Sequence, residues 1–441
     1  MSTTTLPGSR QSPTADPRRG RRRTAYAVAG WLLLVGASVA VGLVLHDRGL
    51  LRLGAFPPFH GELRAAALTW QLLPAAAFAA AAIAVAPRLA RTAGWVRLLL
   101  LTWLGATAWA CVLAASDGGP AALVTPLLHE NEYLGVAAAV GDDPLGWLRH
   151  FAGNVGSYPT HVAGHPPLPV LMFWLPHALG LPLAPSAAAL CILLGASASA
   201  AVLVTARHLV GEETARAAAP YLLLAPYALT VATSADAMFL GVTAWGVALL
   251  TIASVRDSAL LGLAAGVPLG ATAYLNYGLL PIGAIAVAVV VSRPSARAVA
   301  GALAGAALVV GAFTAGGFWW PDGVAATHER WAAGSGSKRP YGYVLVANLA
   351  LLAVLTGPAT AAGLVASRGR RRWLLLGSVV LAVVVLDLSG VTRGEVERIW
   401  LPFAPWLMLA ATALPSGHVR RWLAVQVTTA LLVQGAVKLL W

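Results

Sequence analysis

Acidic side chains and histidines gather in one polar stretch, residues 116–167, of an otherwise apolar chain. The stretch contains the run His129-Glu130-Asn131-Glu132-Tyr133 and, further on, His161 and His165. A glutamate here can act as a general base toward a hydroxyl group, or it can hold a divalent cation through its oxygens. The alternative for Glu130 and Glu132 is a pair of solvated loop acids. The two histidines predict a metal or phosphate contact, or else polar loop residues.

Other acids and an arginine stand at the ends of later apolar segments. Asp236 follows Ser234 at such a boundary, where either side chain can also cap a helix. Glu395 and Glu397 stand beside Arg398, and a guanidinium binds phosphate oxygens in a bidentate manner. This trio therefore predicts either a phosphate site or a structural salt bridge. The pair Asp142-Asp143, which precedes a proline, predicts a helix N-cap or a turn.

The composition is that of a polytopic membrane protein. Hydrophobic residues make up 58% of the 441 and charged residues only 11%, whereas soluble domains carry about 25% charged residues. The lipid interior offers the backbone no water, so the spans are expected to be α-helices. The net charge of +13 does not indicate nucleic acid, because the basic residues lie in short clusters between apolar runs. Cys111 and Cys191 fall inside predicted spans and imply no disulfide.

Apolar runs long enough to cross a bilayer predict about thirteen transmembrane helices. They are residues 25–45, 65–86, 96–115, 184–206, 217–234, 237–254, 258–274, 277–292, 297–316, 343–366, 373–388, 399–414 and 421–440. Residues 1–24 predict a disordered, basic cytoplasmic tail. Residues 25–441 are expected to form a single transmembrane domain.

Alternate loops are rich in arginine, for example at 207–216 and 368–372. This pattern predicts an N-terminus inside the cell and a C-terminus outside. Residues 168–182 are apolar but short, so we expect a juxtamembrane or re-entrant helix there. The outer face then carries a long loop at 116–183, a second loop at 317–342, and the polar positions Asp236, Asn276 and 387–398.

Taken together, these residues resemble the GT-C glycosyltransferases, multi-spanning enzymes that use lipid-phosphate-linked sugars. Examples are the protein O-mannosyltransferases and the lipid A aminoarabinose transferases. Their first large outer loop opens with an Asp-Glu-x-x-Tyr-like motif, matched here by residues 129–133, and later carries a His/Lys-Pro-Pro-Leu-like motif, matched by 165–168. Asp236 matches an acid that is typical at the outer end of a following span. The resemblance covers residues 116–245. It departs from the family at His129, which replaces the leading aspartate, and in the additional spans that precede the loop.

The resemblance implies transfer of a sugar from a polyprenyl-phosphate donor to a hydroxyl of a glycan, lipid or protein acceptor, with inversion, at the outer face of the cytoplasmic membrane. The candidate catalytic residues are then Glu130, Glu132, His129 and Asp236. The candidate substrate-binding residues are Tyr133, His161, His165, Asn276, Glu395, Glu397 and Arg398. A divalent cation, Mg²⁺ or Mn²⁺, is an optional cofactor that would stabilise the leaving phosphate.

Two other functions stay open. A transporter or flippase of lipids or solutes predicts acids at the middle of the membrane and broken spans in matched halves. An inactive relative that serves as a scaffold is favoured by His129 in place of the aspartate. The gathering of charged residues on one face and the lack of an internal sequence repeat favour the enzyme.

Overall fold

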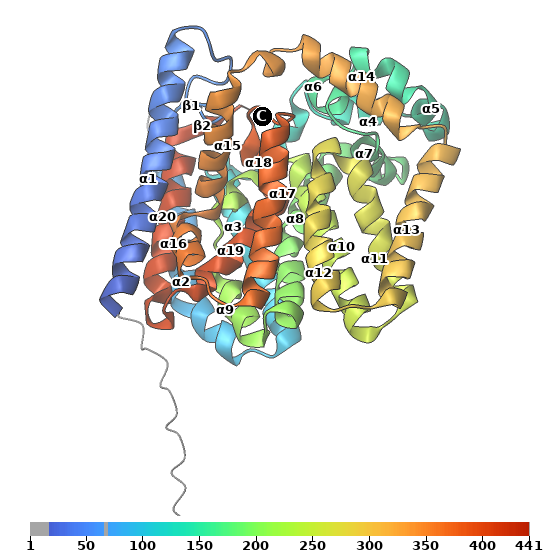
Figure 1. Cartoon of the computed structure of the whole chain (residues 1–441). Helices are drawn as coiled ribbons and strands as arrows, with labels where there is room; N and C mark the ends of the chain where they lie inside the picture. The colour runs from blue at the N-terminus through green and yellow to red at the C-terminus, as the bar shows by residue number, and fades with distance from the viewer. Residues whose placement is uncertain (1–16, 66–68, 441) are drawn as a thin grey trace, which may run out of the picture.

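The computed structural model of the protein describes residues 17–65 and 69–440. Helices run side by side in one bundle, with the start of α1 at one end and the C-terminus at the other (Figure 1). Part of the predicted tail (residues 1–16), residues 66–68 of the predicted span 65–86, and residue 441 lie outside the described residues.

Seven helices among the described residues are long and apolar enough to cross a membrane. They belong to α1 (Pro17–Asp47), α2 (Leu73–Thr92), α3 (Trp95–Ala115), α8 (Leu183–Leu209), α10 (Ala235–Arg256), α13 (Ala296–Ala315) and α17 (Arg370–Ser389). The pair α15 (Tyr341–Thr356) and α16 (Pro358–Ala366) passes the same test but bends by 96°. Gly357, with φ of 74°, and the proline after it account for the break. The protein is therefore an α-helical membrane protein.

Shorter helices occupy the other predicted spans. They are α9 (Glu212–Leu223), α11 (Ala259–Leu275), α12 (Gly283–Ser292), α19 (Ala404–Met408) and α20 (Val419–Ala436). The expected span 217–234 is not one continuous helix, because α9 ends at Leu223 and a 3-10 turn begins at Pro226. At the N-terminus, α1 begins at Pro17, so residues 17–24 of the predicted disordered tail are helical. Arginine is a good helix former, which lets α1 extend beyond its apolar part.

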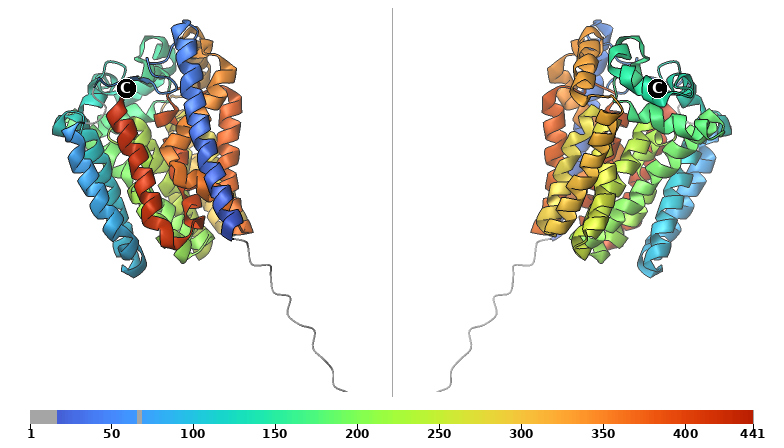
Figure 2. Two further views of the ribbon diagram at one scale, coloured as in Figure 1. Left: turned by 90° about the vertical axis from the view of Figure 1, so that its left-hand side faces the viewer. Right: turned by 90° about the vertical axis from the view of Figure 1, so that its right-hand side faces the viewer.

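A layer of short helices covers the end of the bundle that holds the C-terminus (Figures 1 and 2). It consists of α4 (Leu134–Ala139), α5 (Pro144–Asn154), α6 (Thr160–Ala163), α7 (Leu168–Ala178), α14 (Trp320–Ala333) and α18 (Val396–Ile399). The 11 residues of α7 are consistent with the short outer helix expected at 168–182. Asp143 caps α5 by accepting a hydrogen bond of 2.8 Å from the Gly146 N–H, as its place before Pro144 predicted.

At the same end, β1 (Gly61–Leu63) pairs antiparallel with β2 (Val437–Leu439). The pairing joins the segment after α1 to the end of the chain. The peptide N–H of Leu440 also donates to the carbonyl of His60, at 3.0 Å. The segment that includes His60 is therefore fixed against the C-terminus.

The opposite end of the bundle collects the basic loops. Arg216 donates to the carbonyls of Ala90 and Ala93, and Arg293 donates to the carbonyl of His208. The loops after α2, α8 and α12 are thus in direct contact with one another or with α9. The loops that are joined by hydrogen bonds from Arg216 and Arg293 and the layer of short helices therefore lie at opposite ends of the bundle (Figure 1).

Glycines allow the closest helix packing, between α11 and α13. A Cβ on Gly266 would collide with the carbonyl of Ala302, and one on Gly305 would collide with the carbonyl of Leu263. Such contacts between small residues drive helix association in lipid, where apolar surface alone gives no preference.

Candidate functional site

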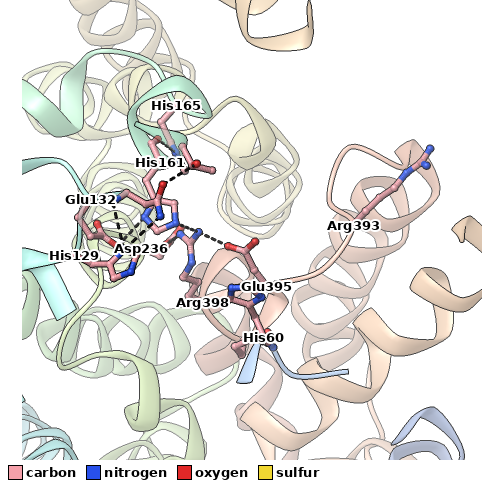
Figure 3. Close-up of polar contacts among 12 residues, drawn as sticks. His60, His129, Glu132, His161, His165, Asp236, Arg393, Glu395 and Arg398 are labelled. Carbon is pink, nitrogen blue, oxygen red and sulfur yellow. Dashed lines mark hydrogen bonds and ion pairs between the residues drawn. The ribbon is translucent and has the colours of Figure 1, made fainter. Parts of the chain in front are cut away.

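A chain of buried polar side chains links four segments that are far apart in the sequence (Figure 3). Glu132 precedes α4, His161 lies in α6, Asp236 lies in the first turn of α10, and Arg398 lies in α18. All four side chains are buried. The site lies where the helical layer meets the body of the bundle.

His161 bridges Glu132 and Arg398. Its Nδ1 lies 2.7 Å from Oε1 of Glu132, and its Nε2 lies 2.9 Å from Nη2 of Arg398. A guanidinium can only donate hydrogen bonds, so Nε2 must accept and the ring proton belongs on Nδ1. His161 is therefore a neutral imidazole that donates to the Glu132 carboxylate.

Arg398 is the positive centre of the site. Its Nη1 donates to Oδ2 of Asp236 at 2.8 Å, and its Nη2 donates to Oε2 of Glu395 at 2.6 Å. Burial by itself would lower the pKa of Arg398, but the carboxylates of Asp236 and Glu395 outweigh it and raise this pKa above its ordinary value. Burial would raise the pKa of Glu395, but Arg398 and His60 lower it to about 2. The arginine and Glu395 are both charged at neutral pH.

Several polar atoms of the site make no hydrogen bond within the described part of the chain. They are Oε2 of Glu132, Oδ1 of Asp236, Nε of Arg398 and the hydroxyl of Tyr133, all buried. Buried polar atoms are nearly always bonded to protein, water or ligand. The site thus has two carboxylate oxygens and two donors with which to bind a polar ligand.

Tyr133 forms an aromatic wall of the site. Its ring centroid lies 6.3 Å from that of His161, 5.9 Å from that of His165 and 5.7 Å from that of Phe173. Burial raises the pKa of Tyr133, and the nearby Asp236 carboxylate raises it further. The hydroxyl therefore keeps its proton and is a hydrogen-bond donor.

His165 and Asn276 form a second buried pair beside His161. Asn276 accepts from the Gly278 N–H through Oδ1, at 2.7 Å, so its amide nitrogen faces Nε2 of His165, at 3.1 Å. Nδ1 of His165 then carries the proton and donates to the carbonyl of His161, at 2.7 Å. Burial lowers the pKa of His165 to about 4, so the ring is neutral at pH 7. The pair fixes the turn that holds His161.

The single turn α6 ends at Ala163, so His161 and His165 do not lie on one continuous helix. Gly164 and the prolines at 166 and 167 follow the end of this turn.

The structure separates the two glutamates that the sequence offered. Glu132 is buried in the site, whereas Glu130 and His129 are exposed. Nδ1 of His129 accepts a hydrogen bond of 3.3 Å from the backbone N–H of Asn131, within its own turn. Of the three candidates in this run, only Glu132 belongs to the buried chain of contacts.

The capping alternative for Ser234 and Asp236 is wrong. Ser234 precedes α10, but its hydroxyl donates to the carbonyl of Thr230 and caps no amide. Asp236 instead forms the ion pair with Arg398. An arginine 162 residues further along the chain decides the role of this acid.

Glu397 lies next to the site and holds the segment before β1. Its Oε1 accepts from the backbone N–H of His60 at 2.8 Å. Burial lowers the pKa of His60. No sequence pattern indicates that His60 lies here, because this residue is outside every motif and its backbone makes the contact.

A buried asparagine positions the loop that carries Glu395 and Arg398. Nδ2 of Asn348 donates to Oδ1 of Asp387 at 2.9 Å and to the carbonyl of Thr392 at 3.0 Å. The one sequence feature that could have indicated this role of Asn348 is its place as a polar residue inside an apolar run. Arg393 of the same loop lies away from the site (Figure 3), at 5.2 Å from the ring centroid of Trp331.

The carboxylates do not converge as metal ligands. No group of three or more His, Cys, Asp or Glu side chains in the described segments could hold a metal ion. Glu132 and Asp236 are instead directed at His161 and Arg398. The Glu132 and Asp236 carboxylates therefore do not fit a site for the optional Mg²⁺ or Mn²⁺. The positive charge at this site is the guanidinium of Arg398.

Comparison with protein families, with curated proteins and with solved structures found no match. The function is therefore argued from the residues and their geometry.

Proposed function

We propose that the protein is a membrane glycosyltransferase that moves a sugar from a polyprenyl-phosphate donor to an acceptor hydroxyl. The observation that carries this proposal is the buried chain Glu132–His161–Arg398–Asp236. It places a carboxylate oxygen with no protein partner near a buried guanidinium. A base and a phosphate-binding cation are what a displacement at a sugar phosphate requires.

Glu132 is the proposed general base. Its Oε2 receives the proton of the acceptor hydroxyl while Oε1 stays bonded to Nδ1 of His161. The hydrogen bond fixes the carboxylate in place, as the third group of a catalytic relay does. Asp236, which also has one oxygen without a protein partner, is the second acid and orients Arg398.

Arg398 is the proposed ligand of the leaving phosphate. The acceptor oxygen forms a bond to the anomeric carbon, the bond from that carbon to the phosphate oxygen breaks, and its electron pair stays on the phosphate. The guanidinium stabilises the charge that develops there. The phosphate would exchange with the half-buried Glu395 carboxylate, one anion for another, while the Asp236 contact stays in place. Attack opposite the phosphate inverts the anomeric centre.

The site is proposed to face the outer side of the cytoplasmic membrane. The loops that are joined by hydrogen bonds from Arg216 and Arg293 lie at the other end of the bundle. Clusters of arginine favour the cytoplasmic side of a membrane. The N-terminus is then inside and the C-terminus outside. On this proposal the chain passes the membrane thirteen times, with the short helices as additional passes packed within the bundle. The polyprenyl tail would lie against the lipid-facing helices.

The test measures transfer of radiolabelled sugar from polyprenyl-phosphate donors by the purified protein in nanodiscs. Glu132→Gln should lower the rate by about 10²–10⁴-fold, the usual contribution of a general base. Glu130→Gln is the matched control: it makes the same change two residues away at an exposed position, and it should leave the rate within about twofold.

Equal rates for the two variants would overturn the role of Glu132. Absence of transfer and of donor hydrolysis with every sugar tested would refute the enzyme. The protein would then be reconstituted into lipid vesicles: movement of the labelled lipid across the bilayer would favour a transporter, and its absence an inactive scaffold.

A further inference from the structure

A second polar feature lies at the same end of the bundle, outside the buried site. It is a pocket of about 810 Å³, here called the terminal pocket. This volume falls within the range of small-molecule sites, about 300–1,000 Å³. The residues that the argument uses are Glu62, Arg64, Trp70, Asp117, Gln434 and Lys438. They come from β1 and the residue after it, the 3-10 turn before α2, the segment after α3, and α20 with β2.

The charges of the terminal pocket are balanced inside it. Arg64 pairs with Asp117 at 2.7 Å, and Lys438 pairs with Glu62 at 3.3 Å. Each cation already has a carboxylate partner, so these four side chains carry no net charge and attract neither an anionic ligand such as a phosphate nor a cation. The balance favours a ligand that is polar and uncharged.

The rest of the lining suits a sugar. Trp70 is 75% exposed and offers a flat ring face. The amide of Gln434 reaches Ser116 at 3.2 Å and has further hydrogen-bonding capacity. The ion-paired side chains have additional donors and acceptors toward hydroxyl groups. An aromatic face together with planar polar groups matches the alternating apolar and hydroxyl faces of a pyranose ring.

Two consecutive glycines keep the pocket open. Gly118 and Gly119 line it with φ of 148° and 72°, and a Cβ on either would meet no atom within 4 Å. These backbone angles favour glycine. The turn therefore leaves space beside the pocket that a side chain would otherwise occupy.

The terminal pocket is connected to the buried site through one residue. His60 directly precedes β1, whose Glu62 lines the pocket. Its backbone N–H donates to Glu397, the neighbour of Arg398. A ligand held in the pocket would thus lie on a segment attached to the site.

We infer that the terminal pocket binds a neutral saccharide, and that this saccharide is part of the acceptor. The assignment as acceptor rests on the proposed function, whereas saccharide binding itself does not. This inference narrows the class of acceptor molecule from a glycan, lipid or protein to a glycan or a molecule that carries one.

The test uses saturation-transfer NMR on the purified full chain in nanodiscs, with the neutral disaccharides mannobiose, maltose and lactose as probes. At least one should bind, and Trp70→Ala should weaken it by about tenfold, since loss of an aromatic contact costs about one such factor. Gln434→Ala should weaken binding as well. Trp319→Ala is the matched control, because Trp319 is also an exposed tryptophan at this end, at 55%, but it does not line the pocket.

Each outcome decides the inference. Failure of all three disaccharides to bind at 10 mM, a concentration on the order of a weak sugar affinity, would overturn it, as would equal effects of Trp70→Ala and Trp319→Ala. Preferential binding of glucose 6-phosphate or of anionic phosphatidylglycerol would also overturn it. Trp70-dependent binding without transfer from any donor would keep the saccharide site and refute the enzyme. Transfer that depends on Glu132 but not on Trp70 would keep the enzyme and reject the terminal pocket as its acceptor site.

Discussion

Removing the charge of Arg398 should destabilise the protein chiefly through the acid that it leaves behind. The change considered is Arg398→Met, which keeps most of the side-chain volume. In the native protein the guanidinium contacts Asp236, Glu395 and His161. The side chain of Asp236 is 1% exposed and that of Glu395 is 21% exposed. Glu395 can therefore turn toward water, while Asp236 would stay as a buried, unpaired carboxylate.

The expected loss of stability is about 3–5 kcal/mol, the usual result of removing one partner of a buried ion pair. The double change Arg398→Met with Asp236→Asn removes the unpaired charge and should recover part of this loss. A coupling energy of about 2–3 kcal/mol is expected for two groups in direct contact. Asp236→Asn alone should cost less than Arg398→Met, because Glu395 still neutralises the arginine.

The assay is unfolding by dodecyl sulfate in mixed micelles, followed by the reaction of a thiol dye with Cys191. This cysteine is free and fully buried in the native protein, so its reaction with the dye reports unfolding once the partly buried Cys111 is changed to Ser in every protein compared. Arg297→Met is the matched control, since its pair with Asp257 is exposed, at 73% and 56%. That variant should change stability by less than about 1 kcal/mol.

The reasoning is refuted if Arg398→Met is no less stable than Arg297→Met. It is also refuted if Asp236→Asn adds its full cost to that of Arg398→Met, because additive losses would mean that the two side chains do not interact.

Two further predictions concern pH and packing. Burial lowers the pKa of His165 to about 4 from an ordinary 6.5, so the unfolded chain binds this proton more readily and stability should fall as pH drops from about 6.5 toward 4. The His165→Gln variant should lose less stability over this pH range than the wild type. Parallel pH profiles of the unfolding midpoint for the two proteins would contradict the prediction. Gly266→Leu should lower the midpoint of thermal unfolding, because the new side chain would push α11 away from α13. Gly311→Leu should leave the midpoint unchanged, because a Cβ at this position meets no atom within 4 Å. Equal midpoints for the two variants would contradict the packing argument.

Local patterns in the sequence were enough to predict the helical membrane architecture and, within the layer of short helices, the helix in residues 168–182. Polar groups are costly in lipid, so the apolar runs along the chain predict the positions of the long helices. The cap at Asp143 was predicted for a similar reason, since its partner lies only three residues away. Seven of the described helices are long and apolar enough to cross a membrane by themselves, because 3-10 turns and a 96° bend interrupt other apolar runs without changing their hydropathy.

The sequence also selected nearly every residue of the candidate site, but not the contacts among them. Glu130 and Glu132 are the same residue type in the same short run, and only the fold buries Glu132 and exposes Glu130. The choice between a cap and an ion pair at Asp236 required Arg398, which lies 162 residues away. The sequence by itself thus determined which side chains are candidates for the site and which segments of the chain carry them. Which carboxylate meets which cation was decided by the tertiary structure, because those contacts depend on how distant helices pack and not on any pattern along the chain.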